Sequence, residues 1–155
     1  MSFTKAKAHL KKYEYQDRIM EFDVSSATVK DAALALNCDE DEIAKTLSFY
    51  IEATPILIVV SGSSKIDNGK YKQEFKTKAK MIPFDEVETK IGHGVGGVCP
   101  FGINNNIEVY LDISLREHQI VYPACGSSNS AVKLTITELE KSSNFKNWID
   151  VCKKN

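Results

Sequence analysis

Residues 46–61, which read TLSFYIEATPILIVVS, decide the fold of this chain. They contain two runs rich in β-branched, aromatic and other apolar residues, Thr46–Glu52 and Ile56–Ser61, separated by the short connection 53–55. Two such runs joined in this way predict a β-hairpin. The most apolar part, Pro55–Val60, is far shorter than the ~20 residues that a membrane-spanning helix needs.

Outward from this hairpin, short helices and strands follow one another without a strict β-α-β alternation. Predicted strands cover residues 18–23, 80–82, 107–112, 120–122, 131–136 and 148–151. Predicted helices cover residues 3–13, 39–44 and 66–78. A further helix has Thr28 as its N-cap, runs to Leu36 and stops at Asn37. Another helix runs from Pro83 to about Ile91, and a short one is capped by Thr137 and runs through Leu139. This mixture favours an α+β or mixed-sheet architecture over a doubly wound one.

Length and composition describe an ordinary globular chain. It has 155 residues, 43% hydrophobic and 26% charged, which predicts one domain spanning 1–155 and excludes disordered, collagen-like and coiled-coil classes. The net charge of −1 argues against a uniformly basic protein that coats nucleic acid, and we expect no DNA partner. The four cysteines form no CxxC pair, and Met1–Lys12 lacks the apolar core of a signal peptide. We therefore expect a reduced, cytoplasmic protein without a membrane partner.

A glycine-rich loop occupies Gly92–Gly102. Its start, GHGVGG, formally matches GxGxxG at 92, 94 and 97, but a dinucleotide site needs a strand before the motif and a helix after it. Here a helix-like segment precedes and Cys99-Pro100-Phe101-Gly102 follows, so we reject that interpretation. A tight surface turn is one alternative. A loop whose bare backbone approaches a ligand is favoured, because its glycines present amides and carbonyls without obstruction.

Two residues of this loop, His93 and Cys99, could form a nucleophile pair. Such a pair needs both side chains within hydrogen-bond reach and a third orienting group, which the spacing does not establish. The alternative is that Cys99 is a small buried residue. No His, Cys, Asp or Glu pattern has metal-ligand spacing, and the acidic run 39–42 fits a solvated helix start. We expect no metal and no cofactor.

Lys45 stands where a short helix is predicted to end and the apolar strand to begin. A lysine there could simply interact with a helix C-terminus. The sequence motifs around Lys45 indicate a functional role instead. The segments Thr28–Ala33, Ile43–Leu47 and Val60–Gly62, and the loop VGGVCPFG at 95–102, resemble the YbaK family, the editing domain associated with prolyl-tRNA synthetase. The order of Tyr110-Leu111-Asp112, a further strand, and Gly126 is similar too, and the resemblance covers about residues 24–152.

The resemblance implies a single α/β (mixed α+β) domain with a mixed, barrel-like sheet flanked by helices. It also implies hydrolysis of the ester joining a wrong amino acid to a tRNA, usually that for proline, in trans, without a metal or a covalent intermediate. Lys45 matches the key functional side chain of the family. The substrate-binding positions that it implies are Thr28, Thr46, Gly96, Gly97, Val98, Cys99, Pro100 and Gly126. The implied partners are the acceptor end of an aminoacyl-tRNA and prolyl-tRNA synthetase.

Some positions depart from the family type that removes cysteine. That type carries Ser-Gly-Gly-x-x-Gly followed by an aspartate, whereas this chain has ACGSSN at 124–129 and Ala131 where the aspartate would be. Thr28 stands where that type has a bulky aromatic residue. These differences argue against cysteine as the amino acid removed, and leave alanine or another small residue open.

The segment from Lys65 to Lys80 holds six lysines, with only Asp67 and Glu74 to offset them, a net charge of +4 over sixteen residues. It is either an ordinary solvated helix face or a contact for the tRNA acceptor stem. The tRNA-binding candidates are Lys65, Lys70, Lys72 and Lys76.

The sequence is therefore compatible with three functions. The first is an aminoacyl-tRNA deacylase. The second is a module of the same fold that binds aminoacyl-tRNA or a free amino acid without hydrolysis. The third is a thiol enzyme that uses Cys99.

Overall fold

The predicted hairpin forms the centre of the molecule, as seen in a computed structural model that describes residues 2–154. Strands β2 (Ile43–Ile51) and β3 (Thr54–Ser61) pair antiparallel along their whole length, from Ala44 opposite Ser61 to Ile51 opposite Thr54. The turn is two residues long, and Glu52 adopts a positive φ of 57° in it. The hairpin prediction is confirmed, with a shorter connection than expected.

Further strands extend the hairpin into a six-stranded mixed sheet of order β8-β6-β2-β3-β5-β9. On one side β6 (Ile120–Pro123) runs parallel to β2, and β8 (Leu134–Thr135) is antiparallel to β6. On the other side β5 (Glu108–Asp112) and β9 (Asn147–Ile149) continue in parallel. Two small ribbons flank the sheet. They pair β1 (Ile19–Glu21) with β7 (Ser130–Val132), and β4 (Ser64–Ile66) with β10 (Cys152–Lys154).

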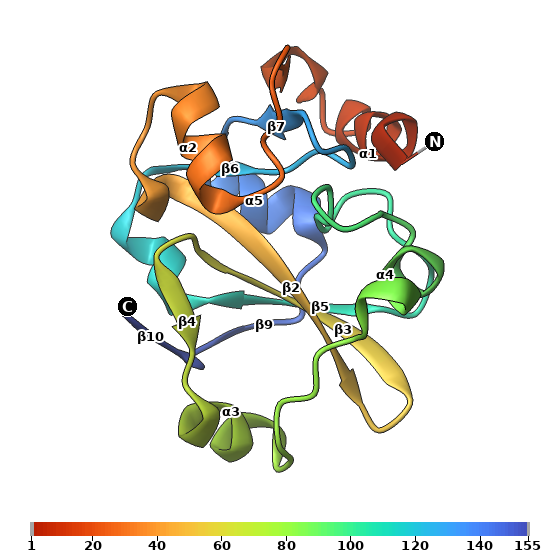
Figure 1. Cartoon of the computed structure of the whole chain (residues 1–155), viewed down its shortest axis with the longest axis vertical. Coiled ribbons are helices and arrows are strands. Elements are labelled where there is room, and N and C mark those ends of the chain that lie inside the picture. Colours follow the sequence, from red (N-terminus) through yellow and green to blue (C-terminus); the bar gives the residue numbers. More distant parts are fainter. Residues whose placement is uncertain (1, 155) are drawn as a thin grey trace.

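The helices are short and lie around the curled sheet (Figure 1). They are α1 (Ser2–Lys11), α2 (Val29–Leu36), α3 (Asn68–Phe75), α4 (Phe84–Ile91) and α5 (Ile136–Ser143), with 3₁₀ turns at Gln16–Arg18, Glu40–Glu42 and Ile113–Glu117. In Figure 1, α2 and α3 lie at opposite ends of the molecule. None of the helices described over residues 2–154 has the length and apolar character needed to cross a membrane. The prediction of a mixed α/β fold is confirmed.

Two large hydrophobic clusters form most of the core, and a third, small one packs α2 against β2 through Ala32, Ala33 and Ile43. The larger of the two large clusters contains Ala44 and partly buried Tyr50 of β2 together with residues of β3, β5, α1, α4 and α5. The smaller of the two contains Phe49 of β2, with Leu47 and Ile51 packed on it, and the fully buried Tyr71 of α3. Because side chains alternate along a strand, β2 contributes to both clusters. The two sides of β2 therefore face different surroundings, which matters for Lys45 and Thr46.

Local capping explains where two helices begin. The Thr28 side chain accepts a hydrogen bond from the Asp31 amide, and α2 ends at Asn37 in the left-handed conformation, both as predicted. Helix α5 begins at a capping box in which Thr135 and Glu138 exchange side-chain and backbone hydrogen bonds. The predicted cap at Thr137 is therefore wrong, because the true capping box lies two residues earlier.

Other boundaries also differ from the sequence predictions. The acidic segment 39–44 forms only the 3₁₀ turn Glu40–Glu42, so Lys45 lies inside β2 and not at a helix end. The predicted helix 66–78 is shortened, because Ser64–Ile66 pairs with β10 and α3 ends at Lys76 with a positive φ. The predicted strand 80–82 is reduced to one bridge between Met81 and Phe49. The predicted strand 131–136 is split into β7 and β8. The predicted strand 148–151 ends at Ile149 as β9, and β10 begins only at Cys152.

A buried carboxylate closes the end of the sheet. Asp112 is 0% exposed, and its two oxygens accept hydrogen bonds from the backbone amides of Ser114 at 2.9 Å and Val151 at 2.8 Å. The carboxylate thus fixes the turn after β5 to the segment between β9 and β10. Buried amides without a partner are costly.

We predict that Asp112→Ala destabilises the protein by about 2–4 kcal/mol, because it leaves one buried and one partly buried amide unsatisfied. Denaturant unfolding measures the change. Asp150→Ala is the matched control, since Asp150 is exposed and makes one surface ion pair with Lys70, which contributes about 0–1 kcal/mol. Equal unfolding free energies for the two variants would contradict the structural role of Asp112.

Candidate functional site

One side of β2 borders a cavity of about 380 Å³. Its walls come from the segment before α2, from α2 itself, from β2, from the residues that lead into α4, from the glycine-rich loop, and from β6 and β7. The lining residues are Ser26–Val29, Ala32, Ile43–Ser48, Met81, Ile82, Phe84, Val87, Val95, Gly96, Val98, Tyr122, Ala124, Ser130 and Ala131. Most of these side chains are apolar, and Lys45 is the one charged residue among them.

The Thr46 hydroxyl has no hydrogen-bond partner among residues 2–154. Its oxygen is buried and makes no hydrogen bond to any described residue. Thr46 lies on the same face of β2 as Ser48 and as Ala44, which belongs to the larger cluster. Thr46 lines the cavity. Buried polar groups are nearly always hydrogen-bonded, so an unpartnered hydroxyl beside a cavity is suited to a ligand.

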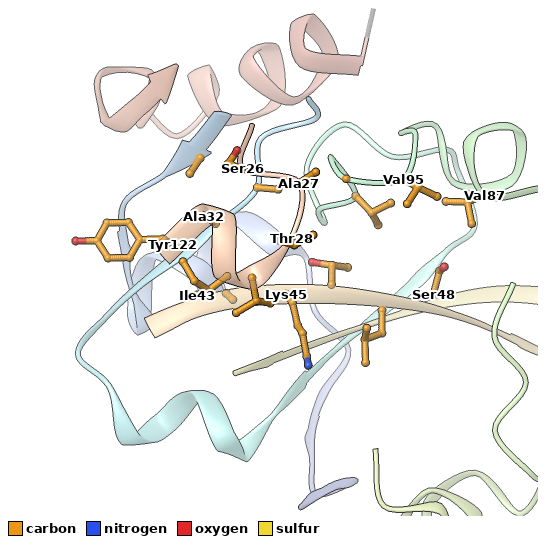
Figure 2. Close-up of a pocket in the computed structure, with 18 of the residues that line it drawn as sticks. Ser26, Ala27, Thr28, Ala32, Ile43, Lys45, Ser48, Val87, Val95 and Tyr122 are labelled. Carbon is orange, nitrogen blue, oxygen red and sulfur yellow. The ribbon is translucent and has the colours of Figure 1, made fainter. Parts of the chain in front are cut away.

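Lys45 is half-buried and makes neither a salt bridge nor a side-chain hydrogen bond within residues 2–154. Burial lowers the pKa of its ammonium, and the nearby Cys152 thiol opposes this to a lesser extent. Figure 2 shows the Lys45 side chain leaving β2 on the side opposite Thr28 and Ala27. Lys45 thus lines the cavity, while its charged end points toward the other face of the strand. An unpaired, partly desolvated cation is unfavourable until an anion compensates it.

The glycine-rich loop reaches the cavity through Val95, Gly96 and Val98. Gly96 has a positive φ of 97°, which lets the loop turn close to Ala27. Gly97 is buried and packs on the backbone of the neighbouring loop: a Cβ on Gly97 would lie 2.6 Å from both the Gly126 carbonyl carbon and the Ser127 nitrogen. The Gly126 amide also donates to the Gly97 carbonyl at 3.1 Å.

The structure therefore divides the sequence-predicted site residues into two groups. Lys45, Thr28, Thr46, Gly96 and Val98 border the cavity together. A second group is buried behind it and, among the described residues, forms none of its lining: Gly97, Cys99, Pro100 and Gly126. The second group supports the loop and does not face the cavity.

Cys99 and His93 are not arranged as a nucleophile pair. Both are 0% exposed, and both hydrogen-bond to the Phe101 carbonyl, His93 through Nε2 at 2.5 Å and Cys99 through Sγ at 3.7 Å. Burial raises the pKa of the Cys99 thiol and lowers that of His93. A neutral, buried thiol that donates to a carbonyl is inert, so the structure does not support the thiol-enzyme alternative.

The lysines proposed to bind tRNA lie away from the cavity. Lys65 belongs to β4, Lys70 and Lys72 belong to α3, and Lys76 caps the end of α3. None of these four residues lines the cavity. The Lys70 ammonium is held by Asp150 at 3.0 Å and by the Cys152 carbonyl at 3.0 Å. Tyr71 and Phe75 of the same helix pack in the smaller cluster, as their spacing predicts.

Sequence reasoning missed the apolar wall formed by Met81, Ile82, Phe84 and Val87. The segment carries no motif. The sequence predicts a strand at 80–82 and a helix from Pro83, but nothing in it indicates that these side chains line a cavity. Residues 2–154 also contain no group of three or more His, Cys, Asp or Glu side chains placed to hold a metal ion.

Comparison with known proteins relates this geometry to tRNA editing. A model of the aminoacyl-tRNA editing domain matches residues 23–142. The uncharacterized protein YwhH of Bacillus subtilis strain 168 is 48% identical over 154 residues, covering 99% of this chain and 98% of that protein. The proline–tRNA ligase of Shouchella clausii strain KSM-K16 is 28% identical over 104 residues, which cover 66% of this chain and 18% of the ligase.

A solved structure shares the fold along nearly the whole chain. It belongs to a protein proposed to be a trans-editing enzyme for prolyl-tRNA synthetase, with 27% identity and a TM-score of 0.87, covering 98% of this chain and 97% of that one. The hypothetical protein APE2540 has the same fold at 24% identity, with a TM-score of 0.81.

The contact between Gly97 and residues 126–127 gives a direct test of the loop packing. We predict that Gly97→Ala costs about 1–3 kcal/mol, because the added carbon overlaps backbone that cannot move independently. Gly69→Ala is the control: Gly69 lies in exposed α3, where a Cβ would meet only the Asp67 carboxylate at 3.3 Å. Alanine there is expected to be neutral or stabilising by up to about 1 kcal/mol. Thermal unfolding of both variants measures the difference, and a Gly97→Ala protein as stable as wild type would contradict the packing.

Proposed function

The chain belongs to the aminoacyl-tRNA editing domain family, and we propose that it hydrolyses the ester bond of a mischarged aminoacyl-tRNA in trans. The finer proposal is that the tRNA is that for proline and that the amino acid is small. The relatives support it, since they include proline–tRNA ligases and a protein proposed to edit for prolyl-tRNA synthetase.

The cavity beside β2 is the observation that carries this proposal. Its volume of about 380 Å³ lies at the small end of ligand sites, which is compatible with an amino acid and part of a ribose. Its apolar wall suits an uncharged side chain, and the unpartnered Thr46 hydroxyl offers one hydrogen bond to the polar part of the substrate. The bare backbone at Gly96 allows close approach of the ester.

The reaction needs only modest help from the protein, because an aminoacyl ester is already activated. A water oxygen adds to the ester carbonyl carbon, the bond from that carbon to the ribose oxygen breaks, and the ribose oxygen takes up a proton. The products are a free amino acid and a tRNA with a free terminal hydroxyl. Groups that stabilise the developing oxyanion supply most of the rate enhancement in such steps. We assign this role to the backbone around Gly96 and to Lys45.

Lys45 must turn to take part. In the observed conformation its ammonium points away from Thr28 (Figure 2). None of the salt bridges among the described residues involves this ammonium, and its four-carbon stem is flexible. The proposal is that the negative charge of the substrate, on phosphate or on the developing oxyanion, draws the ammonium toward the cavity.

A binding module without hydrolytic activity is the second candidate. The observation that favours it is the lining itself, which offers no Cys, His, Asp or Glu side chain as nucleophile or general base. A deacylase built on this site therefore relies on a water held by backbone groups and by the substrate. Prolyl-tRNA synthetase is the proposed protein partner under either candidate.

Ester hydrolysis separates the two candidates. We predict that the purified protein releases a small amino acid, alanine before cysteine, from mischarged proline tRNA and leaves prolyl-tRNA intact. Loss of radiolabelled amino acid from a panel of mischarged tRNAs measures it. Tight binding of these tRNAs without any ester loss would favour the binding module.

A second prediction separates function from stability at Lys45. We expect Lys45→Met to lower the deacylation rate by about 10²-fold or more, as for the loss of one electrostatic contact in the transition state. The same change is expected to raise the melting temperature at pH 7. Because burial lowers the Lys45 pKa in the fold, the charged form favours the unfolded chain, and wild-type stability rises as pH increases through that lowered pKa toward the ordinary lysine value.

Two control variants accompany this measurement. Lys141→Met removes an exposed ammonium on α5 and is expected to change neither quantity. Cys99→Ala removes the buried thiol and is expected to keep substantial deacylation. Wild-type rates in Lys45→Met, or an inactive but folded Cys99→Ala, would overturn the assignment.

A further inference from the structure

Exposed apolar side chains gather at the mouth of the cavity. The structure leaves six large hydrophobic side chains exposed among the described residues, and three of them line this one cavity: Met81 at 56%, Phe84 at 78% and Val95 at 51%. Exposing a phenylalanine to this extent is unfavourable. Such apolar groups beside a binding cavity mark a surface that a ligand covers.

The backbone holds this surface in place. The Lys80 carbonyl accepts from the Tyr50 amide at 2.8 Å, and the Ile82 amide donates to the Ser48 carbonyl at 3.1 Å, so Met81 is fixed against the edge of β2. Phe84 is the first residue of α4 and follows Pro83, whose ring restricts the backbone. Met81 and Phe84 therefore form a preorganised apolar rim and not a mobile loop.

The chain leading to this rim is basic. Residues 76–80 read KTKAK, so three exposed lysines and no acidic residue precede Met81. None of Lys76, Lys78 and Lys80 takes part in a salt bridge within residues 2–154. Acidic residues follow the rim in the first turn of α4, where Asp85 is exposed and Glu86 accepts a hydrogen bond from the Tyr50 hydroxyl at 2.7 Å. Positive charge thus lies on the side of the rim that leads away from α4.

We propose that Met81 and Phe84 bind the terminal adenine of the tRNA, and that Lys78 and Lys80 contact the phosphates next to it. The inference rests on the proposed function, because an aminoacyl group in the cavity leaves its adenine one ribose away, at the mouth. A base has two apolar faces and its neighbouring phosphates are anionic, which matches an aromatic rim followed by lysines. Stacking of a base on an aromatic side chain is worth about 1–3 kcal/mol.

The RNA path proposed here differs from the path that the sequence predicts. The path begins at the α3–α4 connection, through Lys78 and Lys80, and not at Lys65 and Lys70. Lys70 is already neutralised by Asp150, whereas the lysines of the connection are free of such partners among the described residues. Lys76 lies where α3 ends and the α3–α4 connection begins, so it belongs to both segments.

The test uses binding without hydrolysis. The probe is an uncharged hairpin RNA that carries the acceptor stem and single-stranded end of proline tRNA, with 2-aminopurine in place of the terminal adenine. Stacking of 2-aminopurine on Phe84 is expected to quench its fluorescence. We expect Phe84→Ala to weaken binding by about 5- to 150-fold, as for the loss of one base stack, and Phe84→Trp to restore it. Leu34→Ala is the matched control, because Leu34 is 72% exposed on α2 and lies outside the cavity lining.

The salt dependence of binding tests the phosphate contacts separately. The double change Lys78→Ala and Lys80→Ala is expected to reduce the slope of log affinity against log salt by about 1.4, which corresponds to two contacts with a single strand. Lys133→Ala combined with Lys141→Ala is the control pair, both exposed and distant in sequence. An unchanged slope for the Lys78 and Lys80 variant would overturn the assignment of the phosphates.

The outcomes distinguish this inference from the proposed function. Loss of quenching in Phe84→Ala supports the adenine site whether or not any ester is cleaved. If Phe84→Ala binds the probe as tightly as wild type, or if a probe with an abasic 3′ end shows the same loss, the adenine site is wrong even when deacylation is present. An apolar rim that serves a protein partner would give that result. Thermal unfolding confirms that each variant is folded, which is expected because Phe84 is 78% exposed.

Discussion

The pairing register of β2 with β3 is the constraint on which the site depends. A shift of one residue would turn every side chain of β2 to the other face. The observed register extends over the whole hairpin, from Ala44 opposite Ser61 to Ile51 opposite Thr54. It directs Leu47 and Phe49 into the smaller cluster beside α3 and leaves the Thr46 hydroxyl at the cavity. Parallel neighbours on both sides of the hairpin prevent it from slipping.

The opposite wall depends on close packing between loop backbones. Gly97 lies against residues 126 and 127, while Gly126 itself lies against the first turn of α1, where a Cβ would fall 2.5 Å from the Ser2 carbonyl oxygen. Helix α1 thus packs on the loop that contains Gly126. That loop packs on the glycine-rich loop at Gly97, and the glycine-rich loop borders the cavity. Side chains cannot enter these contacts, and this explains why the glycines that matter most to the loop face away from the cavity. Cys99 and His93 belong to the same support through the Phe101 carbonyl.

Lys45 combines an unfavourable environment with a proposed function. A half-buried ammonium that pairs with no described residue lowers the stability of the free protein, and a bound anion would relieve that cost. Active sites commonly retain groups of this kind, because function selects them against stability. The exposed side chains of Phe84 and Met81 at the cavity mouth are a similar case: their exposure to water is unfavourable, and a ligand that covers them would remove that cost.

The sequence by itself determined the hairpin, the α2 helix with its caps, the glycine-rich loop and the family, because these depend on local pattern and on short motifs. It also brought Lys45, Thr46 and Gly96 together as candidates through the resemblance. Only the tertiary structure decided which of them face the cavity, because strand register and loop packing act between segments far apart in the chain. For the same reason the sequence could not separate Gly97 and Cys99 from the lining, or show that Met81 and Phe84 complete it. It also could not place the Lys45 ammonium, since the side of a strand on which a residue lies depends on what packs against each face.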